Sequence, residues 1–154
     1  MRENFKPSVA DFEARVRASF ARQGAMGLLG AVLTRVAPGC VVIELPYRRE
    51  LSQQHGFFHA GMTSTIADTA GGYAGYTLFP ADSSVLTVEF KINLVAPADG
   101  DRLIATGRVK KSGRTLTICE FEVEVVKNGK AKTCALGLQT LMCLQGRADM
   151  SIAG

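Results

Sequence analysis

Apolar residues recur along the chain with two different periods, and each period predicts a different kind of element. Near the N-terminus they recur every three or four positions, which predicts an amphipathic helix over residues 9–22. Residues 27–36 and 40–45 are instead rich in Leu, Val and Ile. The Pro38–Gly39 pair between these two runs is typical of a turn, so we predict a β-hairpin.

The segment from Gly61 to Phe79 contains a single charged residue, Asp68. Its larger side chains recur at spacings of three and four, which predicts a helix. A helix without a charged face is normally buried on all sides. The Asp, several Thr and four glycines make the segment a poor membrane span. We therefore expect a helix in the centre of the core.

The second half of the chain has the pattern of an antiparallel sheet. The pairs Ser112–Gly113 and Asn128–Gly129 are two-residue hairpin signals. The expected class is α+β, with the sheet wrapped around the uncharged helix. The predicted strands are 84–94, 103–111, 115–127 and 130–144. The predicted organisation is an N-terminal helical arm (1–24), one folded domain (25–146) and a C-terminal tail (147–154).

Composition argues against several classes of function. The 154 residues carry a net charge of +4, but only 7% are aromatic and none is Trp, which argues against a nucleic-acid partner. The N-terminal residues mix both charge signs and resemble neither a secretory signal nor a transit peptide, so we expect a cytoplasmic protein. Four cysteines are widely spaced without a C-x-x-C pair, which predicts reduced thiols rather than a metal site: Cys40, Cys119, Cys134 and Cys143.

Asp68 is the first candidate for chemistry. A carboxylate in an apolar helix is costly to bury, so it is expected to be hydrogen-bonded, to cap a neighbouring loop or to take part in a reaction. The residues that share its helical face are all small. They leave room for a ligand or partner helix, or they allow close packing on the sheet. This face consists of Gly61, Ser64, Thr65, Gly71, Gly72 and Gly75.

The start of the same helix is the second candidate. At His59-Ala60-Gly61 the first backbone N–H groups lack partners within the helix and lie at the positive end of its dipole. Such donors stabilise a carbonyl oxygen that gains negative charge. On a straight helix, His59 and Asp68 lie about 13.5 Å apart along the axis and on opposite faces. If both act on one substrate atom, the site must be shared between two subunits.

These residues resemble the PaaI-like branch of the hotdog-fold acyl-CoA thioesterases, and the resemblance extends over residues 27–144. That family carries H-G-G followed by Asp on the central helix, with an Asn or Gln before the His and a Ser or Thr on the next strand. Here the pattern is His59-Ala60-Gly61, Asp68, Gln53 and Thr87, with Ala60 in place of the first Gly.

The resemblance implies a hotdog fold and a role for each of these residues. Asp68 would be nucleophile or general base, and the Ala60 amide at the helix start would hold the carbonyl oxygen. Gln53 would position the water or the carboxylate, His59 would orient the thioester, and Thr87 would hydrogen-bond near Asp68. It also implies a homodimer or homotetramer with interfacial active sites and no metal or other cofactor.

Neighbouring residues are candidates for substrate binding. His55, Phe57 and Phe58 precede the motif and either line an acyl tunnel or lie in an exposed loop anchored by its aromatic rings. Thr65 on the helix is a further candidate. Lys110 and Arg114 belong to a group of basic residues around the hairpin turns that either keeps the sheet edge soluble or contacts coenzyme A phosphates.

The predicted function is hydrolysis of an acyl-CoA to the free acid and coenzyme A. One alternative is a non-catalytic hotdog protein that senses acyl-CoA, which would not need Asp68. Another is a hotdog hydratase or dehydratase, which is less favoured because the His-Phe-Pro type motif is absent. The type of acyl group and the choice between nucleophile and base for Asp68 stay open.

Overall fold

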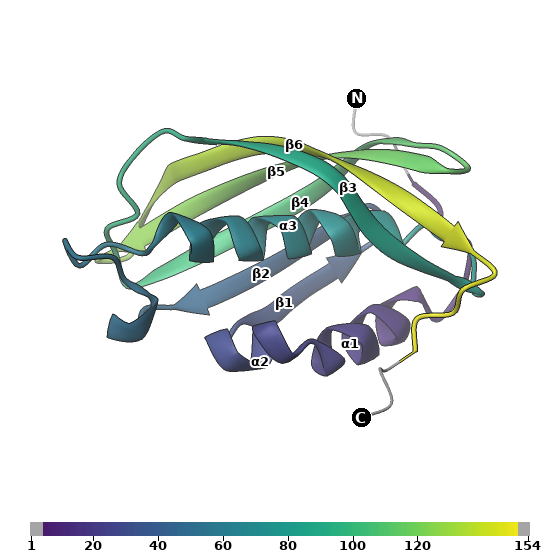
Figure 1. Cartoon of the computed structure of the whole chain (residues 1–154), viewed down its shortest axis with the longest axis horizontal. Coiled ribbons are helices and arrows are strands. Elements are labelled where there is room, and N and C mark those ends of the chain that lie inside the picture. Colours follow the sequence, from purple (N-terminus) through teal and green to yellow (C-terminus); the bar gives the residue numbers. More distant parts are fainter. Residues whose placement is uncertain (1–4, 151–154) are drawn as a thin grey trace.

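One long helix, α3 (Ala60–Tyr76), lies against a six-stranded antiparallel sheet that curves around it (Figure 1). The computed structural model describes residues 5–150. The expected α+β fold, with a long helix wrapped by an antiparallel sheet, is confirmed. The remaining elements are α1 (Phe12–Arg22), α2 (Gly24–Leu29), β1 (Val32–Ala37), β2 (Cys40–Pro46), a 3-10 turn (Arg49–Leu51), β3 (Ser83–Leu94), β4 (Arg102–Ser112), β5 (Leu116–Lys127) and β6 (Lys130–Gln145).

The strands lie in the order β1-β2-β4-β5-β6-β3, so β1 and β3 form the two edges. The predicted turn at Asn128–Gly129 joins β5 to β6, and both residues have the positive φ angles that such a hairpin requires. A bulge interrupts the pairing of β3 with β6 between Thr87 and Glu89. Because of this bulge, Thr87 and Phe90 pair with neighbouring inward-facing positions of β6.

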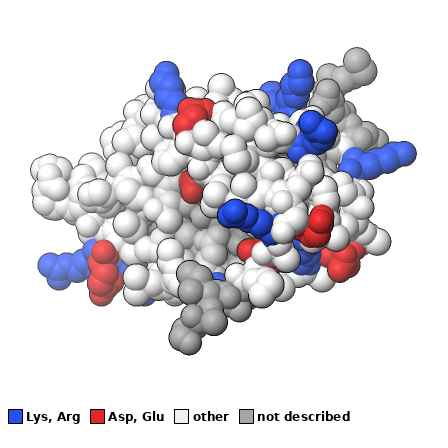
Figure 2. Space-filling model, turned by 45° about the vertical axis from the view of Figure 1, so that its right-hand side comes forward, with Lys and Arg blue, Asp and Glu red and all other residues white. Residues whose placement is uncertain are grey.

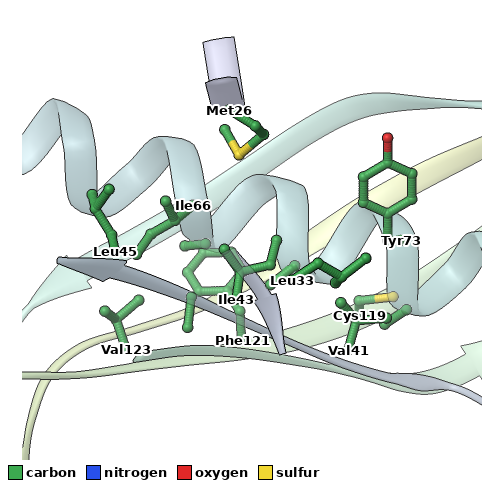
Figure 3. Close-up of a cluster of buried hydrophobic side chains, with 14 of the residues drawn as sticks. Met26, Leu33, Val41, Ile43, Leu45, Ile66, Tyr73, Cys119, Phe121 and Val123 are labelled. Carbon is green, nitrogen blue, oxygen red and sulfur yellow. The ribbon is translucent and has the colours of Figure 1, made fainter. Parts of the chain in front are cut away.

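The core lies between α3 and the inward-facing side chains of the sheet. Figure 3 shows Phe121 and Val123 of β5 and Ile43 of β2 gathered beneath Ile66 of α3. At Gly107 of β4 a Cβ atom would overlap the backbone of α3 at Ala70 and Gly71. The helix and the sheet therefore approach each other more closely than a larger residue would allow.

Residues 24–29 form α2, so the prediction of a strand from residue 27 was wrong. Met26 and Leu29 are buried at helical spacing, and Gly30 ends the helix with a φ of 72°. The Ala31 N–H then donates to the Met26 carbonyl, which is a common way of closing a helix at glycine. The strand begins only at Val32.

The N-terminal helices pack on the end of α3. The Arg15 guanidinium donates to the Tyr76 hydroxyl at 2.8 Å and to the Phe79 carbonyl at 2.9 Å. Arg22 forms an ion pair with Asp149 at 2.6 Å, which links this region to the start of the expected tail. Residues 1–4 of the expected arm and 151–154 of the expected tail lie outside the described residues. No helix within residues 5–150 is long and apolar enough to cross a membrane.

We expect Gly107→Ala to lower the free energy of unfolding by about 1–3 kcal/mol, because the added methyl group must push α3 away from β4. Urea denaturation monitored by circular dichroism measures the change. Gly27→Ala is the matched control, since its Cβ would enter open space on α2. Equal stability of Gly107→Ala and the wild type would show that the close approach is not required.

Candidate active site

Two clefts border α3, and each contains part of the predicted site. The helix-start cleft, of about 490 Å³, contains Gln53, Phe57, Phe58 and Ala60, together with Thr63, Cys134 and residues 94–98. The carboxylate cleft, of about 260 Å³, contains Asp68 and Thr87, together with Gln23, Thr69, Gly72, Tyr73, Val85 and Leu86. The two clefts share no residue, so one chain holds two separate parts of the predicted site.

The loop of residues 52–59, which is held by hydrogen bonds and ring packing, forms one wall of the helix-start cleft. The Phe58 N–H donates to the Ala98 carbonyl at 3.0 Å, and the Phe58 ring packs edge-on against Tyr47. The Gln53 side-chain oxygen accepts a hydrogen bond from the His55 N–H. The loop thus holds Gln53 and Phe57 in the wall of the cleft, whereas His55 is exposed and lines neither cleft.

His59 is the N-cap of α3 through its side chain. Its Nδ1 accepts a hydrogen bond from the Gly61 N–H at 2.9 Å, so in the neutral ring the proton lies on Nε2. The sequence predicted that the Gly61 N–H would be free for a substrate, and the structure shows that it is not. Within residues 5–150 the Ala60 N–H has no partner, and Ala60 lines the cleft. Ala60 therefore supplies the available backbone donor at this helix start.

Cys134 also lines the helix-start cleft and is its one thiol among the described residues. Burial raises the pKa of its thiol to about 11. The thiol is therefore protonated at neutral pH, which makes Cys134 a poor nucleophile. The cleft therefore offers a backbone N–H donor but no thiolate at neutral pH.

Asp68 is half-buried in the carboxylate cleft and is held through one of its two oxygens. Its Oδ1 accepts hydrogen bonds from the Thr87 hydroxyl at 2.7 Å and from the Gln139 amide at 3.0 Å. The contact with Thr87 agrees with what the resemblance implied. Within residues 5–150 no hydrogen bond is made to Oδ2. The carboxylate is thus oriented by two donors while one oxygen stays available.

Gln139 on β6 is a part of this site that the sequence analysis missed. Its side chain is 1% exposed, and its amide nitrogen also donates to the backbone carbonyl of Asp68 at 3.2 Å. Its Oε1 is buried without a partner among the described residues. The signal was present in the sequence, because a Gln occupies an inward position in a strand whose other inward residues are small or apolar.

Three of the small residues on the helical face of Asp68, namely Gly71, Gly72 and Gly75, have different surroundings. A Cβ atom on Gly71 would overlap Gln139, and one on Gly75 would overlap Leu141. These two glycines therefore allow close packing of α3 on β6. Gly72 differs, because its Cβ would enter open space in the carboxylate cleft.

The remaining predicted binding residues lie away from both clefts. Thr65 donates to the Gly61 carbonyl within α3 and lines neither cleft. Lys110 pairs with Glu120 at 3.2 Å, and Arg114 lies in the β4–β5 hairpin. This hairpin is at the end of the sheet opposite to the start of α3 (Figure 1). Within one chain, neither basic residue reaches the helix-start cleft.

Comparison with known proteins identifies the family. Residues 55–133, which include the start of α3 and Asp68, match the model of the thioesterase superfamily. Human acyl-coenzyme A thioesterase 13 is 28% identical over 105 residues, which cover 67% of this chain and 74% of that protein.

Solved structures agree with this assignment. The crystal structure of a thioesterase family protein from Silicibacter pomeroyi has 44% sequence identity and a TM-score of 0.87, covering 88% of this chain and 99% of that chain. The E. coli PaaI protein shares the fold, with a TM-score of 0.78 at 21% identity over 90% of this chain and 96% of that chain.

We expect His59→Ala to destabilise the protein by about 1 kcal/mol, because the substitution removes the side-chain cap of α3. Urea denaturation measures the loss. His59→Asn should retain most of the stability, since Asn is a good N-cap, and the exposed His55→Ala serves as a control. If His59→Ala and His55→Ala are equally stable, the cap contributes nothing.

Proposed function

We propose that this chain, which belongs to the thioesterase superfamily and has the hotdog fold of its PaaI-like members, hydrolyses an acyl-CoA thioester to the free acid and coenzyme A. Family membership establishes a thioester hydrolase. The observation that carries the proposal further is the Asp68 carboxylate in an open cleft: its Oδ1 is held by two donors, and its Oδ2 accepts no hydrogen bond from residues 5–150. The similarity to a human protein named for acyl-CoA hydrolysis supports the choice of substrate.

Asp68 Oδ2 is the reacting atom in this proposal. It either attacks the thioester carbon, expelling the coenzyme A thiolate and forming a mixed anhydride that water then hydrolyses, or it takes a proton from a water that attacks this carbon directly. In both routes one water is consumed, its oxygen forms the new carboxyl bond, and one of its protons ends on the thiol of coenzyme A. Thr87 and Gln139 act as positioning residues, since each donates to Oδ1. A single turnover in oxygen-18 water separates the two roles, because the label enters the Asp68 carboxylate only if Asp68 is the nucleophile.

The Ala60 N–H is the donor that we propose for the carbonyl oxygen. It lies at the positive end of α3 and lines the helix-start cleft, so it favours the negative charge that develops on this oxygen. We propose that Gln53 in the same cleft positions the attacking water or the partner's carboxylate, and that the Nε2–H of His59 orients the thioester.

A homodimer would bring the two parts of the site together. Ala60 and Asp68 are eight residues apart, about 12 Å along the helix, which is too far for both to contact one carbonyl group. β3 is a 12-residue edge strand with exposed apolar side chains, among them Leu86 (56% exposed) and Val88 (53%). Such an edge can pair with a second copy of itself. We propose a dimer in which Asp68 of one subunit faces Ala60 of the partner subunit; association of two dimers into a tetramer stays a prediction.

Lysines at the β5–β6 turn are better placed than Lys110 and Arg114 to contact the coenzyme A phosphates. Lys130 and Lys132 border a depression that shares Pro97 with the helix-start cleft, and Lys127 there is paired with Asp99 at 2.6 Å. On the face shown in Figure 2, basic and acidic side chains lie close together with wide uncharged areas between them. A local group of lysines, rather than a broad basic surface, would thus attract the phosphates.

We expect Asp68→Asn to lower kcat at least about a hundredfold, because Asn cannot act as base or nucleophile while its amide oxygen can still accept from Thr87. Gln139→Met, which fills the same space without a donor, should lower kcat with little change in KM. Thiol release from a panel of acyl-CoAs measures both effects, and melting temperatures verify folding. If neither the wild type nor the variant hydrolyses a thioester, yet acyl-CoA raises both melting temperatures, the protein is a sensor.

We expect Ala60→Pro to lower kcat about 100- to 1000-fold while α3 stays intact. Proline is favoured at the first helical position, and His59 (φ −64°, ψ 138°) already has the extended backbone that a following proline requires. The only group lost is the N–H donor. An unchanged kcat would remove Ala60 from the mechanism.

Subunits of Ala60→Pro and Asp68→Asn, refolded together, test the shared site. About half of the random dimers are hybrids, and each hybrid has one site with both native groups, so about a quarter of wild-type activity should return. Absence of recovery in a mixture shown to contain hybrid dimers would contradict the interfacial site.

A further inference from the structure

We infer that the carboxylate cleft holds the acyl group of the thioester and that Gln23 closes its far end, which limits the length of the acyl group; this inference rests on the proposed function. Asp68 and Thr87 line the cleft, and so do Gln23 and Tyr73, which are hydrogen-bonded to each other. From Asp68 to Tyr73 the helix advances by about 7.5 Å. An acyl chain whose carbonyl carbon lies at Asp68 and which runs along α3 therefore meets Gln23 after a short distance.

A hydrogen-bonded group of side chains forms this end. The Gln23 amide donates to the Tyr73 hydroxyl at 3.0 Å, and the same hydroxyl is 2.9 Å from the hydroxyl of Ser19. Burial raises the pKa of Tyr73, so the hydroxyl stays protonated at neutral pH. A longer apolar chain would have to displace these groups and leave them without partners, which is costly.

Gly72 keeps the middle of the cleft open. It lies one turn beyond Asp68, and its Cβ would have no neighbour within 4 Å. Packing on the sheet explains Gly71 and Gly75 but not Gly72, whose replacement by most residues would favour the helix. The missing side chain therefore adds volume to the cleft and is not demanded by the fold.

The size of the cleft indicates the class of acyl group. A cavity of about 150 Å³ is enough for benzene, so about 260 Å³ holds a short chain or a single substituted ring. A long fatty acyl chain does not fit unless Gln23 moves. The wall also includes Val85 and Leu86, whose apolar side chains suit an apolar acyl group.

Two variants change the cleft in opposite directions. Gly72→Val narrows it and should lower the ratio of kcat/KM for hexanoyl-CoA over acetyl-CoA about tenfold. Gln23→Ala opens the end and should raise the ratio for lauroyl-CoA over hexanoyl-CoA about tenfold. Gly27→Val, on the exposed part of α2 where a Cβ also meets open space, is the matched control and should change neither ratio. Steady-state thiol release measures the rates, and melting temperatures verify folding.

The outcomes separate this inference from the proposed function. If the wild type depends on Asp68 but hydrolyses lauroyl-CoA as well as hexanoyl-CoA, or if Gln23→Ala leaves their ratio unchanged, the length limit is wrong and the hydrolase proposal stands. A Gly72→Val variant that loses acetyl-CoA and hexanoyl-CoA activity equally also contradicts it. If Asp68→Asn retains full activity, both proposals fail.

Discussion

The close contact between α3 and the sheet is the constraint on which the other features depend. Gly107 on β4 and Gly71 and Gly75 on α3 remove the side chains that would keep the two backbones apart. This contact brings Gln139 of β6 within hydrogen-bonding distance of Asp68. The small residues that weaken α3 as an isolated helix thus provide the approach that orients its carboxylate.

The same helix presents two chemically different groups at separate places. Its start offers the Ala60 N–H at the positive end of the dipole, and its middle offers a carboxylate oriented by β3 and β6. A rigid helix cannot bend these groups together, so its geometry favours a site assembled from two copies. The long apolar edge of β3 gives a physical reason for such copies to associate.

Much of the fold could be predicted from the sequence, because the four long strands and their turns carry strong local signals. The short helix Gly24–Leu29 could not be predicted, because a Val- and Leu-rich strand follows it directly and the hydrophobic pattern does not separate the two. The boundary lies at Gly30, where a positive φ ends the helix. In the site, Asp68 was singled out by its type and its position in an apolar helix, whereas Thr87 was assigned only through the resemblance to the family. The hydrogen bond from the Gly61 N–H to His59 depends on a side-chain rotamer, which composition and spacing do not show. The strand pattern marks Gln139 as an inward polar residue, but its contact with Asp68 depends on how the sheet packs against α3.

The bulge in β3 also sets the phase of the strand. Along a regular strand, Thr87 and Phe90 would point to opposite sides of the sheet, because three positions reverse the parity. The bulge takes up one extra residue, Val88, so that Thr87 and Phe90 lie on the same side of the sheet. Thr87 there contacts Asp68, and Phe90 packs against Phe121. Deletion of Val88 would therefore remove the bulge and still leave Thr87 and Phe90 two positions apart on one face of a regular strand, so the inside–outside pattern of β3 would survive the loss of this residue.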